Sequence, residues 1–127
     1  MTTTSSTLLV IEDEKAISEM YRFKLSLEGF TVFTADDGQL GLAACKEHKP
    51  DLILLDLKMP VMTGDEMLEK LRQTDWGADI RVVILTNISR DEAPHNLRLL
   101  SVDRYIVKAH HTPAQVVDVV KEVLARN

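Results

Sequence analysis

Short apolar runs alternate along the chain with segments that carry helical periodicity. Five runs have the length and composition of β-strands, and connecting segments with helix signals separate them. Parallel strands need such long crossover connections, so the alternation predicts a parallel sheet. The five runs are Leu8–Ile11, Thr31–Thr34, Leu52–Leu55, Val82–Leu85 and Tyr105–Val107.

Apolar spacing and residues that start or stop a helix predict the helices. In the last helix, Thr112 is the cap, Pro113 is the first residue, and an apolar stripe follows. After the fourth strand, Asp91 is expected to cap a short helix with Pro94 in its first turn, where the missing amide does little harm. The other three helices are expected around residues 17–25, 38–48 and 63–72.

The predicted fold class is α/β: a doubly wound, five-stranded parallel sheet with five helices on its two faces. Near-continuous apolar runs such as Leu52–Leu55 agree with strands that are buried on both sides. The flavodoxin-like strand order 2-1-3-4-5 is expected, and it places the first and third strands side by side. In open sheets of this kind, ligands bind at the carboxyl ends of the strands.

Composition narrows the classes of function. The 127 residues suffice for one domain, expected at residues 7–127 after a flexible tail over residues 1–6. The net charge of -5 gives no basic surface for direct binding to nucleic acid. Neither a signal peptide nor a membrane span is visible in the sequence, so a cytoplasmic protein is expected. The single cysteine, Cys45, stands among apolar residues and is interpreted as a buried, unreactive thiol.

Polar residues stand at the carboxyl ends of four predicted strands. Because the first and third strands are neighbours, the acids that follow them should meet at one end of the sheet. Three carboxylates about 5 Å apart repel by roughly 3 kcal/mol per pair at an effective dielectric constant near 20, so they need a cation. Oxygen ligands without nearby Cys or His favour Mg²⁺. The strand-end residues are Glu12 and Asp13, then Asp56, Thr86 and Lys108.

Lys108 and Thr86 complete a set of groups suited to a phosphoryl ligand. Lys108 begins two strand spacings, roughly 10 Å, from Asp56, and its long side chain can cover much of that distance. Thr86 stands on the strand between them and offers a hydroxyl donor. A carboxylate nucleophile, a divalent cation, an ammonium group and a hydroxyl together can cradle a phosphoryl group, so Asp56 is the candidate acceptor.

These residues closely resemble the response-regulator receiver domain of two-component signalling, the family of the single-domain chemotaxis regulator. The resemblance covers about residues 7–126 and rests on four motifs in register after successive strands. It implies that Asp56 is the phosphoryl acceptor and that Asp13 and Asp56 are direct Mg²⁺ ligands. The motifs are VIEDE, LLDLKMPVMTG, VVILTN and YIVK.

The resemblance also implies the remaining roles. Glu12 would act on the metal through water, and the backbone carbonyl of Lys58 would be a further ligand. Thr86 and Tyr105 would form the switch pair, and Lys108 would contact the phosphoryl group. The chain would be no enzyme but a phospho-acceptor that assists its own phosphorylation and dephosphorylation. The implied partners are a sensor histidine kinase or phosphotransfer protein and a downstream protein target, with the chain a monomer or weak homodimer.

Some residues depart from the family pattern. Glu12 stands where Asp is more frequent, and Asn87 stands where a small residue usually follows the switch threonine. The bulkier Asn87 is expected to alter the rate of dephosphorylation. Lys58 adds a second cation beside the acceptor, where it is expected to shield the phosphoryl group.

Two other functions stay open at this point. A phosphatase of the haloacid-dehalogenase type also uses an aspartate nucleophile at a strand end. It needs a second acid two residues later, where Lys58 stands. A pseudo-receiver would keep the fold as an interaction module without accepting phosphate. Asp13, Asp56 and Lys108 argue against that function, whereas Asn87 leaves room for it.

Overall fold

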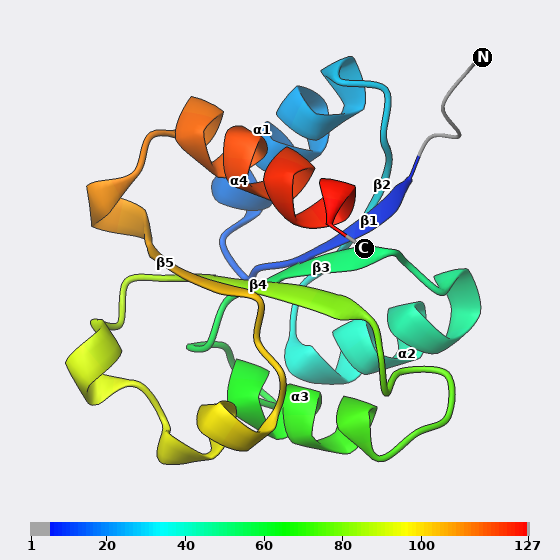
Figure 1. Ribbon diagram of the computed structural model, residues 1–127, viewed down its shortest axis with the longest axis vertical. Coiled ribbons are helices and arrows are strands. Elements are labelled where there is room, and N and C mark those ends of the chain that lie inside the picture. The colour runs from blue at the N-terminus through cyan, green and yellow to red at the C-terminus, as the bar shows by residue number, and fades with distance from the viewer. Residues whose placement is uncertain (1–5, 127) are drawn as a thin grey trace.

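A computed structural model describes residues 6–126 as a parallel sheet covered by helices (Figure 1). The strand order is β2-β1-β3-β4-β5, as the sequence predicts. Every pair of neighbouring strands is parallel. The strands are β1 (Thr7–Ile11), β2 (Thr31–Ala35), β3 (Leu52–Leu55), β4 (Arg81–Thr86) and β5 (Arg104–Val107).

Two helices cover each face of the sheet, with α1 and α4 on one side and α2 and α3 on the other (Figure 1). The last helix begins as the sequence predicts. Thr112 Oγ1 accepts the amide of Gln115 at 3.2 Å, and Gln115 Oε1 accepts the amide of Thr112 at 2.8 Å. No helix within residues 6–126 combines the length and the apolar character needed to cross a membrane. The helices are α1 (Lys15–Leu27), α2 (Gly38–His48), α3 (Gly64–Arg72) and α4 (Pro113–Ala125).

The side chains of the central strands alternate between two apolar cores. In β3, Leu52 and Leu54 belong to the core under α1 and α4. Ile53 and Leu55 belong to the core under α2 and α3. Because both faces are buried, β3 is apolar throughout, and the first charged residue is Asp56 just beyond its end.

The connection between β4 and β5 differs from the expected fourth helix of five. Within residues 6–126 the structure has four α-helices, and this connection contains two short 3-10 turns instead. Ser89, rather than Asp91, precedes the first turn. Ala93 is extended, with φ -64° and ψ 147°, because the ring of the following Pro94 disfavours a helical conformation there. Pro94 therefore divides the segment instead of starting a helix. The turns are η1 (Arg90–Glu92) and η2 (His95–Leu99).

The sheet is joined to the end of the expected N-terminal tail. Residues 1–5 of that tail lie outside the described residues. The carbonyl of Ser6, the last residue of the tail, accepts the amide of Thr31 at 3.0 Å. Ser6 thus lies beside the start of β2.

Candidate functional site

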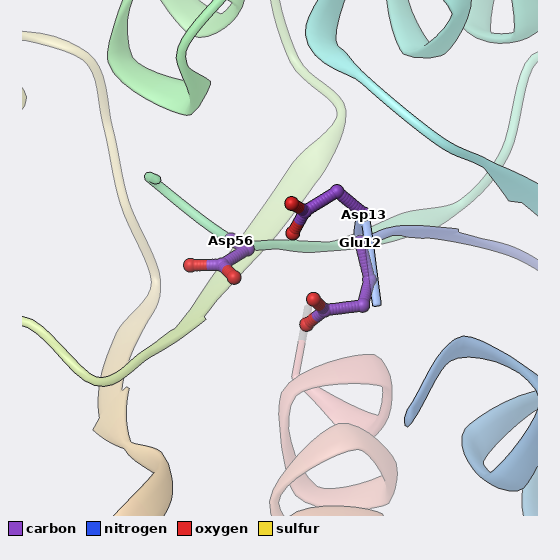
Figure 2. Close-up of side chains that lie close together, drawn as sticks. All are labelled: Glu12, Asp13 and Asp56. Atoms are coloured by element: carbon purple, nitrogen blue, oxygen red, sulfur yellow. The ribbon is translucent and has the colours of Figure 1, made fainter. Parts of the chain in front are cut away.

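Three carboxylates meet at the carboxyl end of the sheet (Figure 2). Ile11 in β1 pairs with Leu55 in β3, so the next residues, Glu12 and Asp56, leave the two central strands side by side. One carboxylate oxygen from each of Glu12, Asp13 and Asp56 lies within 4.8 Å of the others. The structure therefore brings together the three acids that the sequence analysis placed at this edge.

Two of these acids are buried and the third is exposed. The exposed fraction is 3% for Glu12 and 6% for Asp56, whereas Asp13 is exposed to solvent. Backbone amides contact both buried carboxylates: Glu14 donates to Glu12 Oε2 at 3.1 Å, and Lys58 donates to Asp56 Oδ1 at 3.3 Å. Asp13 is thus the member of the cluster that is exposed to solvent.

Lys108 contacts both buried acids. Its Nζ lies 2.6 Å from Glu12 Oε1 and 3.1 Å from Asp56 Oδ2. Lys108 directly follows β5 and starts the turn η3 (Lys108–His110), so its side chain reaches past β4 to the central strands. Burial opposes its positive charge, but the hydrogen bond to Glu12 and the charge of Asp56 outweigh burial and raise the pKa of Lys108.

Lys108 alone does not balance the negative charge of the cluster. Burial raises the pKa of Glu12, and the nearby charge of Asp56 adds to this effect, although the hydrogen bond from Lys108 acts against it. One ammonium group stands against three carboxylates. The donor atoms are all oxygens, which is the ligand set that hard divalent cations take in proteins. The acidic cluster could therefore hold a metal ion.

Thr86 and Tyr105 are connected through the backbone of Ile88. Thr86 is fully buried at the end of β4, and its Oγ1 accepts the amide of Ile88 at 3.4 Å. The Tyr105 hydroxyl donates to the carbonyl of Ile88 at 2.7 Å. Within residues 6–126 neither side chain makes a hydrogen bond to Asp56. The predicted switch pair is therefore linked to the same loop residue and not directly to the acid.

Comparison with known proteins identifies the family. The chain matches the family model of the response regulator receiver domain over residues 8–121. The chain belongs to this family. A receiver domain is a signalling module of two-component systems that is phosphorylated on an aspartate.

Two curated relatives illustrate the match to this receiver domain. The probable transcriptional regulatory protein TcrX of Mycobacterium tuberculosis is 35% identical over 104 residues, which are 80% of this chain and 43% of TcrX. The phosphate regulon transcriptional regulatory protein PhoB of Pseudomonas aeruginosa is 34% identical over 122 residues, which are 94% of this chain and 52% of PhoB. The chain spans about half the length of these curated relatives.

Solved structures agree with the fold of this receiver domain. The chemotaxis protein CheY4 of Vibrio cholerae is similar with a TM-score of 0.86 and 26% identity, covering 94% of this chain and 99% of CheY4. A CheY-like receiver domain protein from Methanospirillum hungatei JF-1 is similar with a TM-score of 0.84 and 28% identity, covering 95% of this chain and 94% of that protein.

Gly64 packs the receiver domain's helix α3 tightly behind the candidate acceptor. A Cβ atom at Gly64 would lie 2.2 Å from the carbonyl oxygen of Asp56 and 2.9 Å from the Cα atom of Leu57. The amide of Gly64 also donates to the carbonyl of Leu57 at 2.9 Å. Sequence reasoning missed this contact. The glycine at the end of the LLDLKMPVMTG motif was the only signal in the sequence. It did not reveal that the backbone of Asp56 and Leu57 lies against this position.

Two other predicted positions of the receiver domain are exposed. The Lys58 side chain faces solvent, and its backbone amide contacts Asp56 Oδ1. The proposed metal contact of the Lys58 carbonyl stays a prediction. Asn87 follows Thr86 and is also exposed, and its expected effect on dephosphorylation stays a prediction as well.

Proposed function

We propose that this receiver domain, taken as residues 7–127, acts as a phosphorylation-dependent switch in which Asp56 accepts the phosphoryl group. The observation that carries the proposal is the contact of 3.1 Å between Lys108 Nζ and Asp56 Oδ2 inside a cluster of three carboxylates. An aspartate that only ends a strand or caps a helix needs no buried ammonium partner. The neighbouring groups match those that phosphoryl transfer requires.

Asp56 supplies the attacking oxygen in this proposal. A carboxylate oxygen forms a bond to phosphorus while the bond from phosphorus to the imidazole nitrogen of the donor breaks, and that nitrogen keeps the electron pair. The product is an acyl phosphate on Asp56. The amide of Lys58 contacts one carboxylate oxygen and Lys108 contacts the other, so the side chain is oriented before a donor arrives.

Lys108 and Thr86 are proposed to contact the oxygens of the new phosphoryl group. The ammonium of Lys108 already lies beside Asp56 and needs little movement. Thr86 Oγ1 accepts the amide of Ile88, which leaves its own hydroxyl proton available to donate. Tyr105, whose hydroxyl contacts the same residue, would respond when Thr86 and its loop move. By these contacts the domain would assist its own phosphorylation and dephosphorylation.

The acidic cluster fits a Mg²⁺ ion. Asp13 and Asp56 would bind it directly, Glu12 would act through water, and the backbone carbonyl of Lys58 would be a further ligand. The fit is supported by the oxygen-only donor set within 4.8 Å and by the negative charge that Lys108 leaves unbalanced. When bound, Mg²⁺ supplies positive charge that neutralises the oxygens of a transferring phosphoryl group.

The proposed donor is a phosphohistidine on a sensor kinase or on a phosphotransfer protein. The output is proposed to pass to a downstream protein target and not to nucleic acid bound by this domain, because the net charge is -5. A monomer or a weak homodimer is proposed. A pull-down with and without a beryllofluoride mimic of the phosphoryl group would identify partners that prefer one state.

Labelling by radioactive acetyl phosphate tests the proposed acceptor. The wild-type protein is expected to take up label only when Mg²⁺ is present, and Asp56→Asn should take up none. The matched control is Asp118→Asn, which removes an exposed carboxylate from α4, away from the carboxyl end of the sheet, and should leave labelling unchanged. Undiminished labelling of Asp56→Asn would contradict the assignment.

The same experiment separates the two other functions. A pseudo-receiver would neither bind Mg²⁺ nor take up label in the wild-type protein. A phosphatase would turn over an excess of phosphate ester, whereas the proposed switch takes up one phosphoryl group on one residue.

A further inference from the structure

The loop after β4 carries an arginine that the proposed phosphoryl chemistry does not use. Arg90 is exposed at the start of η1, and its Nη2 donates to the backbone carbonyl of Tyr105 at 2.8 Å. Its Cζ atom lies 5.6 Å from the centroid of the Tyr105 ring, within the range of a cation–π interaction. A single side chain therefore contacts both the backbone and the ring of Tyr105.

Tyr105 is bound to the same loop a second time. Its hydroxyl donates to the carbonyl of Ile88 at 2.7 Å and lies 3.4 Å from the carbonyl of Ser89. These bonds run from β5 to the loop, whereas the bond from Arg90 runs from the loop to β5. Residues 88–90 and Tyr105 are thus connected by hydrogen bonds donated in both directions.

Ile88 joins this arrangement to the candidate site. Its amide contacts Thr86 Oγ1, and its carbonyl accepts the Tyr105 hydroxyl. A movement of Thr86 toward Asp56 would therefore displace Ile88. Tyr105 would follow that displacement as long as its ring stays seated on the loop.

Packing alone does not keep the ring in place. Tyr105 lies on the edge strand β5 and is only half-buried. A groove of about 440 Å³ opens beside it, lined in part by Arg90 and Arg98. The ring therefore has space to leave the loop, and a side chain that covers it restrains this movement.

We propose that Arg90 is a positioning residue that keeps Tyr105 seated on residues 88–90, so that loop and ring move as one unit when the acceptor site changes. The inference rests on the proposed function, because the movement begins with Thr86 responding to a phosphoryl group on Asp56. In physical terms, Arg90 contributes to the coupling free energy between the acceptor site and the groove beside β5.

Fluorine NMR can follow this coupling directly. The protein contains two tyrosines, so incorporation of fluorotyrosine gives one signal for Tyr21 and one for Tyr105. Tyr21 is buried in the core under α1 and α4, so its signal reports whether the fold is intact, and free fluorotyrosine provides the chemical-shift reference. Spectra are recorded without and with saturating beryllofluoride and Mg²⁺, and labelling by acetyl phosphate is measured on the same samples.

In the wild-type protein the Tyr105 signal is expected to shift when the mimic is added. In Arg90→Ala the Tyr105 signal should start closer to the signal of free fluorotyrosine. The shift caused by the mimic should fall to about half or less, because Tyr105 loses the hydrogen bond to its backbone carbonyl and the cation–π contact with its ring. Arg90→Lys should give an intermediate shift. Arg98→Ala is the matched control, because it removes the same charge from the same groove and, within residues 6–126, Arg98 makes no hydrogen bond to Tyr105.

The outcomes separate this inference from the proposed function. If the wild-type protein is labelled and Arg90→Ala shifts as the wild type does, the positioning role is wrong and the proposed function stands. If Arg98→Ala reduced the Tyr105 shift as much as Arg90→Ala does, the positioning role of Arg90 would also be wrong, because the loss of positive charge would then be the cause. If the wild-type protein neither takes up label nor responds to the mimic, both the proposed function and the positioning role of Arg90 are wrong. A purely structural role for Arg90 would lower the melting temperature and leave the Tyr105 shift of the folded variant unchanged.

Discussion

The ammonium nitrogen of Lys108 lies nearer to Glu12, at 2.6 Å, than to Asp56, at 3.1 Å. Both acids are buried at the ends of the two central strands. Lys108 is therefore the counter-ion of both acids. The stability of the domain and the charge of its site are thus connected through one side chain.

Removal of Lys108 should destabilise the protein when no Mg²⁺ is present. Lys108→Ala is expected to lower the free energy of unfolding by about 2 kcal/mol, because two buried carboxylates lose a charged donor. Added Mg²⁺ should restore part of this loss by replacing the positive charge. Urea unfolding with and without Mg²⁺ measures both effects.

The control for this prediction is Lys121→Ala. Lys121 pairs with Glu28 at the surface, where solvent screens the charges, so its removal should change stability far less. Equal losses in the two variants, or a loss in Lys108→Ala that Mg²⁺ leaves unchanged, would show that the buried cluster does not control the charge balance.

Asp13→Asn should have the opposite effect on stability. The exposed Asp13 lies within 4.8 Å of two buried carboxylates, and removal of its charge is expected to raise the free energy of unfolding by about 1 kcal/mol without Mg²⁺. The variant should also lose most of the stabilisation that Mg²⁺ gives the wild-type protein. Thermal unfolding over a range of Mg²⁺ concentrations tests this. Full stabilisation by Mg²⁺ in Asp13→Asn would exclude Asp13 as a ligand.

A methyl group at Gly64 should be costly. The added Cβ would meet the backbone of Asp56 at 2.2 Å, so Gly64→Ala is expected to lower the free energy of unfolding by about 2–3 kcal/mol. It should also slow labelling by acetyl phosphate, because the backbone of the acceptor must shift. Gly41→Ala is the comparison, since its Cβ would meet the Cδ1 atom of Ile11 at 2.5 Å, the end of a flexible side chain. A smaller cost at Gly64 than at Gly41 would contradict the backbone contact as the cause.

Cys45 should be unreactive in the folded protein and should give stability a dependence on alkaline pH. The side chain is fully buried, and burial raises the pKa of its thiol from 9.0 to about 12. Above the pKa of the unfolded state only the unfolded chain releases this proton, so stability is complete below about pH 9 and falls as the pH rises toward 12. Between neutral pH and about pH 10, the wild-type protein should lose about 1 kcal/mol more of its free energy of unfolding than Cys45→Ala loses. Urea unfolding at two pH values measures it, and an equal loss in both proteins would exclude Cys45 as the source.

The sheet and the place of its charged residues were predictable because both depend on local sequence. Strands buried on both faces are uniformly apolar, so the first polar residue after each marks the edge of the sheet. Strand order then decides which of these residues are neighbours. Asp56 and Glu12 follow paired residues of β3 and β1, and the structure places them together for that reason.

The segment between β4 and β5 was not predictable in the same way. The effect of Pro94 on Ala93 ended the expected helix, although proline at the start of a helix is common. The contacts of Arg90 with Tyr105 depend on the resulting loop conformation, which no periodic pattern encodes. The preference of Lys108 for Glu12 likewise depends on ångström-scale differences between two carboxylates.

Chemical trapping of the phosphorylated residue tests the role of Asp56 most directly. Borohydride reduces an aspartyl phosphate to homoserine, and peptide mass spectrometry locates the converted residue after treatment with acetyl phosphate. We expect homoserine at position 56, formed in the presence of Mg²⁺ and strongly reduced in Asp13→Asn. Homoserine at another acid, or its absence from the wild-type protein under the same conditions, would contradict Asp56 as the phosphoryl acceptor.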